Sequence, residues 1–324
     1  MANRKDLLKN SVQDLDLDSI KNVEDLVRQL GRLGGFMAPR VYEAVKILDK
    51  MVRNGDCKIF LSFTANLVAT GLRSVFADMI KRGFVDAVVT TGGSIDHDIA
   101  RSFGGEYYSG FFDFNDEYLR EQGIHRLGNV FIPFESYGEI IEREVHRILE
   151  ELVKEKSLWS PSELLKEFGK YLKDENSILK AAYDAQVPIF SPGLVDSAFG
   201  TALYTFNQMQ RLKPRGVKVE LDTLKDMEKI SDIVYESKKM GALIVGGGIS
   251  KHHVIWWAQF KGGLDYAIYI TTAVEWDGSL SGARLKEAIS WGKVKPSAKK
   301  VTIYGDATII LPLIYIPVRS LKGE

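Results

Sequence analysis

Ala242-Leu243-Ile244-Val245-Gly246-Gly247-Gly248 is the stretch of sequence that decides the fold of this chain. Four consecutive apolar residues are typical of a strand buried on both faces, and such strands occur in parallel sheets that helices cover. Three glycines end the predicted strand, and the pattern over 251–260 predicts a helix soon after them. A strand, a glycine turn and a helix form the unit from which α/β proteins are built.

The same unit recurs along the chain. Short apolar runs predict five further strands, at 58–62, 86–90, 188–190, 266–270 and 301–304. Amphipathic patterns predict five further helices, at 39–52, 67–81, 138–154, 161–172 and 221–239. The alternation predicts an α/β fold with a parallel, Rossmann-like sheet and helices on both faces. We expect a single domain over 1–324, in which residues 1–35 form a helical N-terminal arm.

The composition excludes several classes of protein. The 324 residues include 43 basic and 43 acidic side chains, and this zero net charge disfavours a nucleic-acid binder with a broad basic face. It also leaves room for self-association. No signal core follows Met1, and no apolar run reaches the roughly 18 residues of a membrane helix, so we expect a cytoplasmic protein. The single cysteine, Cys57, lies in a predicted strand and is expected to be a buried thiol.

Glycine, hydroxyl and carboxylate residues follow five of the predicted strands. These segments are Thr91-Gly92-Gly93-Ser94, Ser191-Pro192-Gly193, Gly246-Gly247-Gly248, Thr271-Thr272-Ala273 and Gly305-Asp306-Ala307. Ligands of parallel sheets bind outside the carboxyl ends of the strands. Glycine allows close approach of the backbone, and helix N-termini favour phosphate. The sequence therefore predicts one long crevice, although the triple glycine is not the G-x-G-x-x-G dinucleotide fingerprint.

Ser290-Trp291-Gly292-Lys293 carries the second signal. A lysine in a loop is more often a solvated side chain, but the tryptophan and the nearby Glu287 favour a lysine that forms an imine with a substrate carbon. His252 opens the helix after the glycines and is placed to act as acid, base or amine partner. His97 could be a metal ligand, but no second ligand pair has the right spacing, so we expect no metal site.

Several blocks of this sequence, in the same order, resemble the deoxyhypusine synthase family. The blocks are 88–93, 126–129, 190–192, 246–253, 265–273, 277–279, 281–283, 287–293 and 306–307. The resemblance covers about residues 57–312. It implies the NAD-binding fold of that family and a homotetramer with sites at dimer interfaces. It further implies NAD-dependent transfer of the aminobutyl group of spermidine, through an imine on an enzyme lysine, to a lysine of the translation factor 5A precursor.

The family also implies a role for each matched position. Lys293 is similar to the imine-forming lysine, and His252 to the histidine that handles protons. Positions implied to bind the substrate are Asp96, His97, Thr201, Asp277, Gly278, Ser279, Glu287 and Trp291. Positions implied to bind the cofactor are Ala65, Asn66, Leu67, Val68, Ala69, Thr91, Gly92, Gly93, Asp196, Gly247, Thr272, Asp306 and Ala307.

Three positions depart from the family pattern. His97 and Thr201 stand where many members have acidic residues, and Leu280 stands where some do. A charged hydrogen bond contributes about 1.5–3 kcal/mol, so these departures affect which amine is preferred. Three readings follow: a deoxyhypusine synthase, a related aminobutyl transferase acting on a small amine (homospermidine synthase-like), or a non-catalytic NAD- or polyamine-binding protein. Some family members carry an N-terminal helix that covers the site entrance, and residues 1–35 are candidates for that role.

Overall fold

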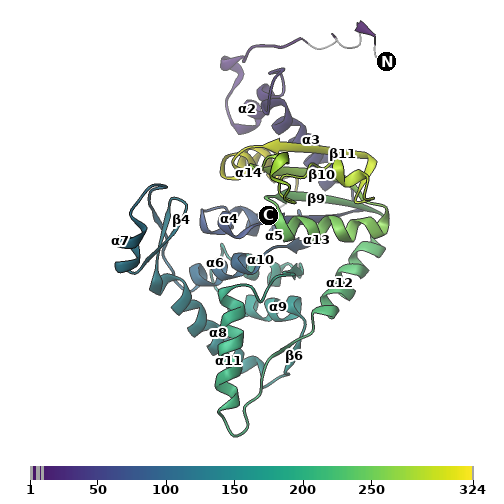
Figure 1. The fold of residues 1–324 in the computed structure, drawn as a ribbon. Coiled ribbons are helices and arrows are strands. Elements are labelled where there is room, and N and C mark those ends of the chain that lie inside the picture. Colours follow the sequence, from purple (N-terminus) through teal and green to yellow (C-terminus); the bar gives the residue numbers. More distant parts are fainter. Residues whose placement is uncertain (1–2, 5–7, 9–10, 323–324) are drawn as a thin grey trace.

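The fold is built on a six-stranded parallel sheet (Figure 1). The computed structural model describes residues 3–4, 8 and 11–322. The strands are β1 (Cys57–Phe63), β2 (Ala87–Val89), β7 (Ile189–Phe190), β9 (Lys239–Val245), β10 (Leu264–Thr271) and β11 (Val294–Tyr304). All six predicted strands are confirmed. Five are apolar runs that the sheet buries on both faces, whereas β11, at the edge of the sheet, alternates buried and more exposed residues.

The strand order is β11-β10-β9-β1-β2-β7, and every neighbouring pair is parallel. The chain starts at the central β1 and moves outward through β2 to β7. It then returns to β9, beside β1, and moves outward through β10 to β11. This is the doubly wound order of dinucleotide-binding folds, whose ligand crevice lies where the winding direction reverses. Here the reversal lies between β1 and β9.

Helices cover both faces of the sheet, as predicted. The longer helices are α3 (Ala38–Arg53), α5 (Arg73–Lys81), α6 (Gly92–Ser102), α8 (Gly138–Leu152), α9 (Pro161–Tyr171), α11 (Ala198–Arg211), α12 (Thr223–Glu236), α13 (Gly248–Ala258) and α14 (Ala307–Tyr315). Side chains alternate along β1: Ile59 and Leu61 join one apolar core, whereas Phe60 joins the core on the opposite face. The Cys57 thiol is buried, as expected.

Two predicted helices have the wrong bounds. The segment 67–81 is not one helix, because Gly71 has a left-handed φ of 107° between α4 (Ala65–Ala69) and α5. The helix predicted over 221–239 ends at Glu236, and Lys239 already begins β9. Periodicity alone marked neither boundary. Leu72 continues the apolar pattern beyond Gly71, and the polar Ser237 and Lys238 after α12 are residue types that an amphipathic helix also carries.

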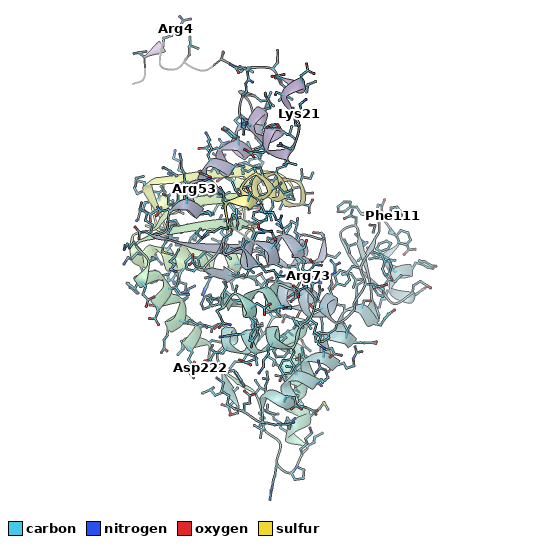
Figure 2. All side chains as sticks on the ribbon, turned by 180° about the vertical axis from the view of Figure 1, so that it is seen from behind. Arg4, Lys21, Arg53, Arg73, Phe111 and Asp222 are labelled. Atoms are coloured by element: carbon cyan, nitrogen blue, oxygen red, sulfur yellow. The ribbon has the colours of Figure 1, made fainter. Side chains whose placement is uncertain are left out.

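The aromatic-rich segment 104–137 forms a lobe beside the main sheet. It contains an antiparallel sheet of β3 (Tyr108–Ser109), β5 (Val130–Pro133) and β4 (Ile124–Leu127), together with α7 (Asp116–Glu121). Figure 2 shows Phe111 at the outer edge of this lobe. The remaining short elements are α10 (Ile178–Asp184) and the parallel pair β6 (Leu158–Trp159) and β8 (Glu220–Leu221).

Only part of the predicted N-terminal arm lies within the described residues. Residues 1–2, 5–7 and 9–10 are outside them. The helix α2 (Val23–Leu30) begins at Asn22, whose side chain accepts a hydrogen bond from the Asp25 backbone N–H at 2.9 Å. Val27 of α2 is buried in the same core as Val41 of α3. This helix therefore packs on the body of the protein.

Candidate functional site

The glycine turns meet at the carboxyl edge of the sheet, around the reversal between β1 and β9. A Cβ atom on Gly246 would lie 2.9 Å from the Thr64 Oγ1, and one on Gly93 would lie 3.0 Å from the Ala65 Cβ. A Cβ on Gly247 would overlap Ser281. Only a hydrogen fits at Gly247, so glycine there is required by the packing of the crevice wall.

The positions predicted to bind the cofactor gather at this edge. Ala65, Asn66, Leu67, Val68 and Ala69 form α4, directly after β1. Thr91 precedes α6 after β2, and Thr272 follows β10. Asp306 accepts a hydrogen bond from the Thr308 N–H at 2.8 Å and caps α14, whose first residue is Ala307. Asp196 lies exposed just before α11.

This edge fits a dinucleotide. The N-termini of α6 and α13 both follow strands of the central sheet there, and helix N-termini attract phosphate groups. Gly248, the first residue of α13, has no atom within 4 Å of the place a Cβ would occupy. Asp196 and Asp306 are exposed carboxylates that suit ribose hydroxyls.

Lys293 lies between two tryptophan rings. Its Nζ is 5.1 Å from the ring centre of Trp291 and 5.5 Å from that of Trp256, although the residue is only 8% exposed. The turn at Gly292, with a φ of 68°, places the lysine directly before β11. Tryptophan faces attract cations, so the two rings hold the Lys293 amine in a defined place.

His252 is linked to Lys293 through Trp256. The imidazole stacks on the Trp256 ring, with 5.6 Å between ring centres and 24° between planes. Burial, together with the charge of Lys293, lowers the pKa of His252. A neutral imidazole near the lysine can accept a proton. Sequence reasoning missed Trp256, although it lies four residues after His252 and therefore on the same face of α13.

Lys293, with the two tryptophans beside it, lies at one end of the sheet. The predicted cofactor positions lie at the opposite, carboxyl edge, which we call the cofactor edge. Val294 pairs with Leu264 at the start of β10, whereas Tyr304 pairs with Thr271 at its end. Seven residue steps of about 3.3 Å place these two ends about 23 Å apart. Within one protomer, the two halves of the predicted site are therefore separate.

Three predicted substrate positions lie in the same half of the predicted site as the cofactor positions. Asp96 is buried on α6, where its carboxylate accepts hydrogen bonds from the backbone N–H groups of Ala198 and Phe199 at 3.0 and 2.7 Å. Burial raises the Asp96 pKa, and these bonds oppose the shift. The neighbouring His97 is also buried, and its Nδ1 lies 2.8 Å from the Tyr107 hydroxyl. Thr201 is exposed on α11, and its hydroxyl donates to the Ser197 carbonyl.

The other substrate positions lie on the connection from β10 to β11. Asp277 accepts a hydrogen bond from the Ser279 N–H at 2.7 Å, around Gly278, whose φ is 70°. Further along, Glu287 begins a short 3-10 helix, and Trp291 is 65% exposed. This connection starts at the cofactor edge and ends at Lys293, so it is the segment that joins the two halves.

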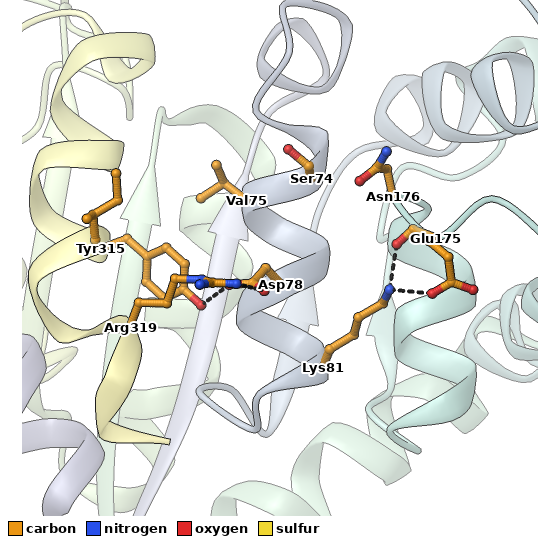
Figure 3. A pocket seen from close by; sticks show the side chains of 9 residues that line it. Ser74, Val75, Asp78, Lys81, Glu175, Asn176, Tyr315 and Arg319 are labelled. Carbon is orange, nitrogen blue, oxygen red and sulfur yellow. Dashed lines mark hydrogen bonds and ion pairs between the residues drawn. The ribbon is translucent and has the colours of Figure 1, made fainter. Parts of the chain in front are cut away.

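A separate pocket of about 360 Å³ lies between α5, α10 and α14 (Figure 3). Its charged side chains are paired. Asp78 accepts hydrogen bonds from Arg319 and Tyr315, and Lys81 donates one to Glu175. Arg319 holds the pKa of Asp78 below its usual range. None of the predicted site residues lines this pocket.

Two features are absent from the described part of the chain. Among the described residues, no group of three or more His, Cys, Asp or Glu side chains is arranged to hold a metal ion. No helix in the described part of the chain combines the length and the apolar character needed to cross a membrane.

Comparison with other proteins identifies the family. The sequence profile of deoxyhypusine synthase matches residues 25–318. Two relatives named probable deoxyhypusine synthase are those of Sulfurisphaera tokodaii, 55% identical, and Sulfolobus acidocaldarius, 56% identical. Each alignment covers 96% of this chain and 97% of the relative. Both therefore match along nearly their entire length.

Solved structures agree with the fold. A deoxyhypusine synthase structure from Entamoeba histolytica superposes with a TM-score of 0.65 at 22% identity, covering 97% of this chain and 98% of the other. Unliganded AgrE superposes with a TM-score of 0.52 at 12% identity, covering 90% of this chain and 35% of AgrE. The profile match and the close relatives together place this chain in the deoxyhypusine synthase family of transferases.

Proposed function

We propose that this enzyme uses NAD to transfer the aminobutyl group of spermidine to a lysine of the translation factor 5A precursor, in the cytoplasm. The observation that carries the proposal is the Lys293 amine, held between Trp256 and Trp291 with His252 stacked beside it. A nucleophilic lysine needs a defined position and a neighbouring group that accepts protons. The family membership supplies the reaction class.

The proposed reaction has four covalent steps. Spermidine loses a hydride from the carbon next to its secondary amine and a proton from the nitrogen, which gives an imine. The Lys293 amine attacks that carbon, the remaining diamine leaves, and the aminobutyl fragment stays on the lysine as a new imine. The acceptor lysine then displaces Lys293, and return of the hydride reduces the last imine to the product amine. His252 is placed to take and return the protons.

When bound, NAD would supply the hydride chemistry, as acceptor of the hydride from spermidine and as its donor to the last imine. The N-termini of α6 and α13 would hold its phosphates, and Asp196 and Asp306 would bind its ribose hydroxyls. The chain's own contribution is to orient the cofactor and to keep water from the imine.

Two copies of the chain are needed to complete one site in this proposal. Ile249 and Trp256 of α13 and Phe260, in the short 3-10 helix that follows it, are 46%, 41% and 46% exposed. Val254, Ile255 and Ala258 of α13 are buried in the apolar core, and exposed apolar residues on the other side are typical of a surface that a partner covers. A second copy covering this stripe would bring its cofactor edge to Lys293, in keeping with the homotetramer that the family implies.

Subunit complementation tests this arrangement. We expect a mixture of Lys293→Ala protein and an Asp196→Ala/Asp306→Ala double variant to regain about a quarter of wild-type activity. Random pairing makes half of the dimers mixed, and each mixed dimer has one intact site of two. The two variants are co-expressed with different tags, and the activity of the unfractionated mixture is compared with that of each parent. The isolated mixed dimer is expected to reach about half of wild-type activity. Mixed dimers as inactive as their parents would show that the site is not shared.

The proposed activity is tested directly with purified components. Enzyme, NAD, spermidine labelled in its butylamine part and the purified factor precursor are incubated, and label on the precursor is measured. Transfer of label to a precursor lysine is the expected result. No transfer by folded enzyme that binds NAD would refute the proposed protein acceptor.

A second candidate function is transfer of the aminobutyl group to a small amine. The observation that favours it is His97, which is buried against Tyr107 where many family members have an acid. Burial lowers the pKa of His97 to about 4, so the side chain is neutral and offers no charge to a polyamine. Product analysis with putrescine or agmatine as acceptor distinguishes the two functions.

A further inference from the structure

We propose that Lys251 is a positioning residue that fixes the segment 280–283 to α13 and so keeps the amine-binding residues in place beside His252. The inference rests on the proposed function, because it assigns Lys251 a part in binding the amine. Lys251 itself is not placed to react, since its Nζ is directed at two backbone carbonyls. It adjoins His252, so both residues belong to the same turn of α13.

The Lys251 side chain is buried and used for hydrogen bonds. The residue is 2% exposed, and its Nζ donates to the carbonyl oxygens of Leu280 and Ala283 at 2.6 and 2.5 Å. The same Nζ lies 3.9 Å from the ring centre of Tyr269. Burial lowers the pKa of the ammonium to about 8, and the Glu287 carboxylate opposes that shift. Burying a lysine is costly, so packing alone would favour an apolar residue here.

The segment bound by Lys251 is also held from the sheet and from the start of α13. The Ser281 carbonyl accepts hydrogen bonds from the Tyr269 hydroxyl at 2.5 Å and from the Thr271 hydroxyl at 3.2 Å. The Ser281 hydroxyl accepts one from the Gly248 N–H at 3.1 Å. Lys251 and Tyr269 therefore act on the same short segment from two different elements.

Hydrogen bonds connect this segment to the predicted amine site. The Gly282 N–H donates to the carbonyl and the hydroxyl of Ser279, at 3.1 and 3.2 Å. Ser279 in turn donates its N–H to the Asp277 carboxylate at 2.7 Å. A displacement of the segment 280–283 would therefore move Asp277, the carboxylate placed to bind an ammonium group. The expected consequence is weaker binding of the amine, with the chemistry at Lys293 preserved.

The test compares three variants in the full-length enzyme. Lys251→Met removes the two bonds from α13, and Tyr269→Phe removes the hydroxyl that holds Ser281. Lys300→Met is the matched control, because Lys300 also donates to two backbone carbonyls, those of Pro296 and Ala298, but on β11. For each variant we measure the KM for spermidine, kcat, and hydrogen exchange of the amides over 279–284.

We expect Lys251→Met and Tyr269→Phe each to raise the spermidine KM about 10-fold or more while kcat changes less than about threefold. Hydrogen exchange over 279–284 becomes faster in both variants. The KM increase in the double variant is smaller than the product of the two single increases, because both substitutions act on one segment. Lys300→Met leaves the KM and the exchange rates unchanged. Borohydride trapping still labels Lys293 in every variant.

Several results would overturn the proposal. One is unchanged KM and exchange in Lys251→Met, and another is loss of trapping at Lys293 with unchanged exchange, which would assign Lys251 a chemical role. If Lys251→Met does not fold, the Tyr269→Phe variant is the test. Unchanged hydrogen exchange and unchanged KM in that variant would then contradict the proposal. Hydrogen exchange needs no substrate, so it tests the anchoring of the segment even if the proposed transferase activity itself proves wrong.

Discussion

Replacing Lys293 with alanine is expected to reduce transferase activity by at least about 1,000-fold, because the covalent carrier of the aminobutyl group is removed. Lys293→Arg should be similarly inactive, since a guanidinium keeps the charge but does not form the imine. Activity is measured as label transferred from spermidine. Mass spectrometry after borohydride trapping reports whether residue 293 carries the fragment.

Lys295→Ala is the matched control for this experiment. Lys295 lies two residues further along, and its Nζ donates to the Asp265 carboxylate at 2.8 Å, away from the tryptophan pair. We expect the Lys295→Ala variant to keep near wild-type activity, and borohydride to trap the aminobutyl fragment on its Lys293. Survival of turnover in Lys293→Ala would show that the lysine is structural and that the proposed imine mechanism is wrong.

Replacing Asp98 with alanine is expected to lower the free energy of unfolding by about 3–5 kcal/mol, the cost of breaking a buried ion pair from one side. Asp98 is 1% exposed, and its carboxylate accepts hydrogen bonds from Arg73 Nε at 2.6 Å and from the Ser177 hydroxyl at 2.9 Å. It also accepts hydrogen bonds from the backbone N–H groups of Ile178 and Leu179, the first two residues of α10. Alanine would leave the buried Arg73 without its main partner and the first two backbone N–H groups of α10 without their acceptor.

Glu151→Ala is the control for the Asp98 experiment. Glu151 pairs with Lys154 at 2.8 Å, but both side chains are more than half exposed, so the expected change is at most about 0.5 kcal/mol. Denaturant unfolding of both variants is measured at one protein concentration, because assembly affects apparent stability. A transition for Asp98→Ala that coincides with wild type would mean that Arg73 and Asp98 do not contribute as a buried pair.

Strands were easier to predict from this sequence than helix ends. Five of the six strands are apolar runs buried from both sides, so their residue types report their environment directly, whereas β11 alternates buried and more exposed residues. The break at Gly71 and the end of α12 at Glu236 are not marked by the apolar pattern, and only the packing against neighbours fixes them. The start of α9 is different: Ser160 forms a capping box with Glu163, and such a cap depends only on adjacent residues.

Contacts between distant parts of the chain could not be read from residue types. Lys251 was only one residue of a quoted motif, yet the structure places its amine on the carbonyls of Leu280 and Ala283. Trp256 likewise had no predicted role, and only the packing of α13 brings its ring to Lys293. These partners are separated by about 30 or more residues in the sequence, which local periodicity does not relate.

The sequence by itself determined the six strands of the sheet, the small and polar residues at their carboxyl ends, and the family. These features depend on local residue types, whose burial and turn preferences act over a few positions. Only the tertiary structure decided that Lys293 lies at the opposite end of the sheet from the cofactor edge, flanked by Trp256 and Trp291. That arrangement depends on how β10, β11 and α13 pack together, and packing is a property of the whole chain.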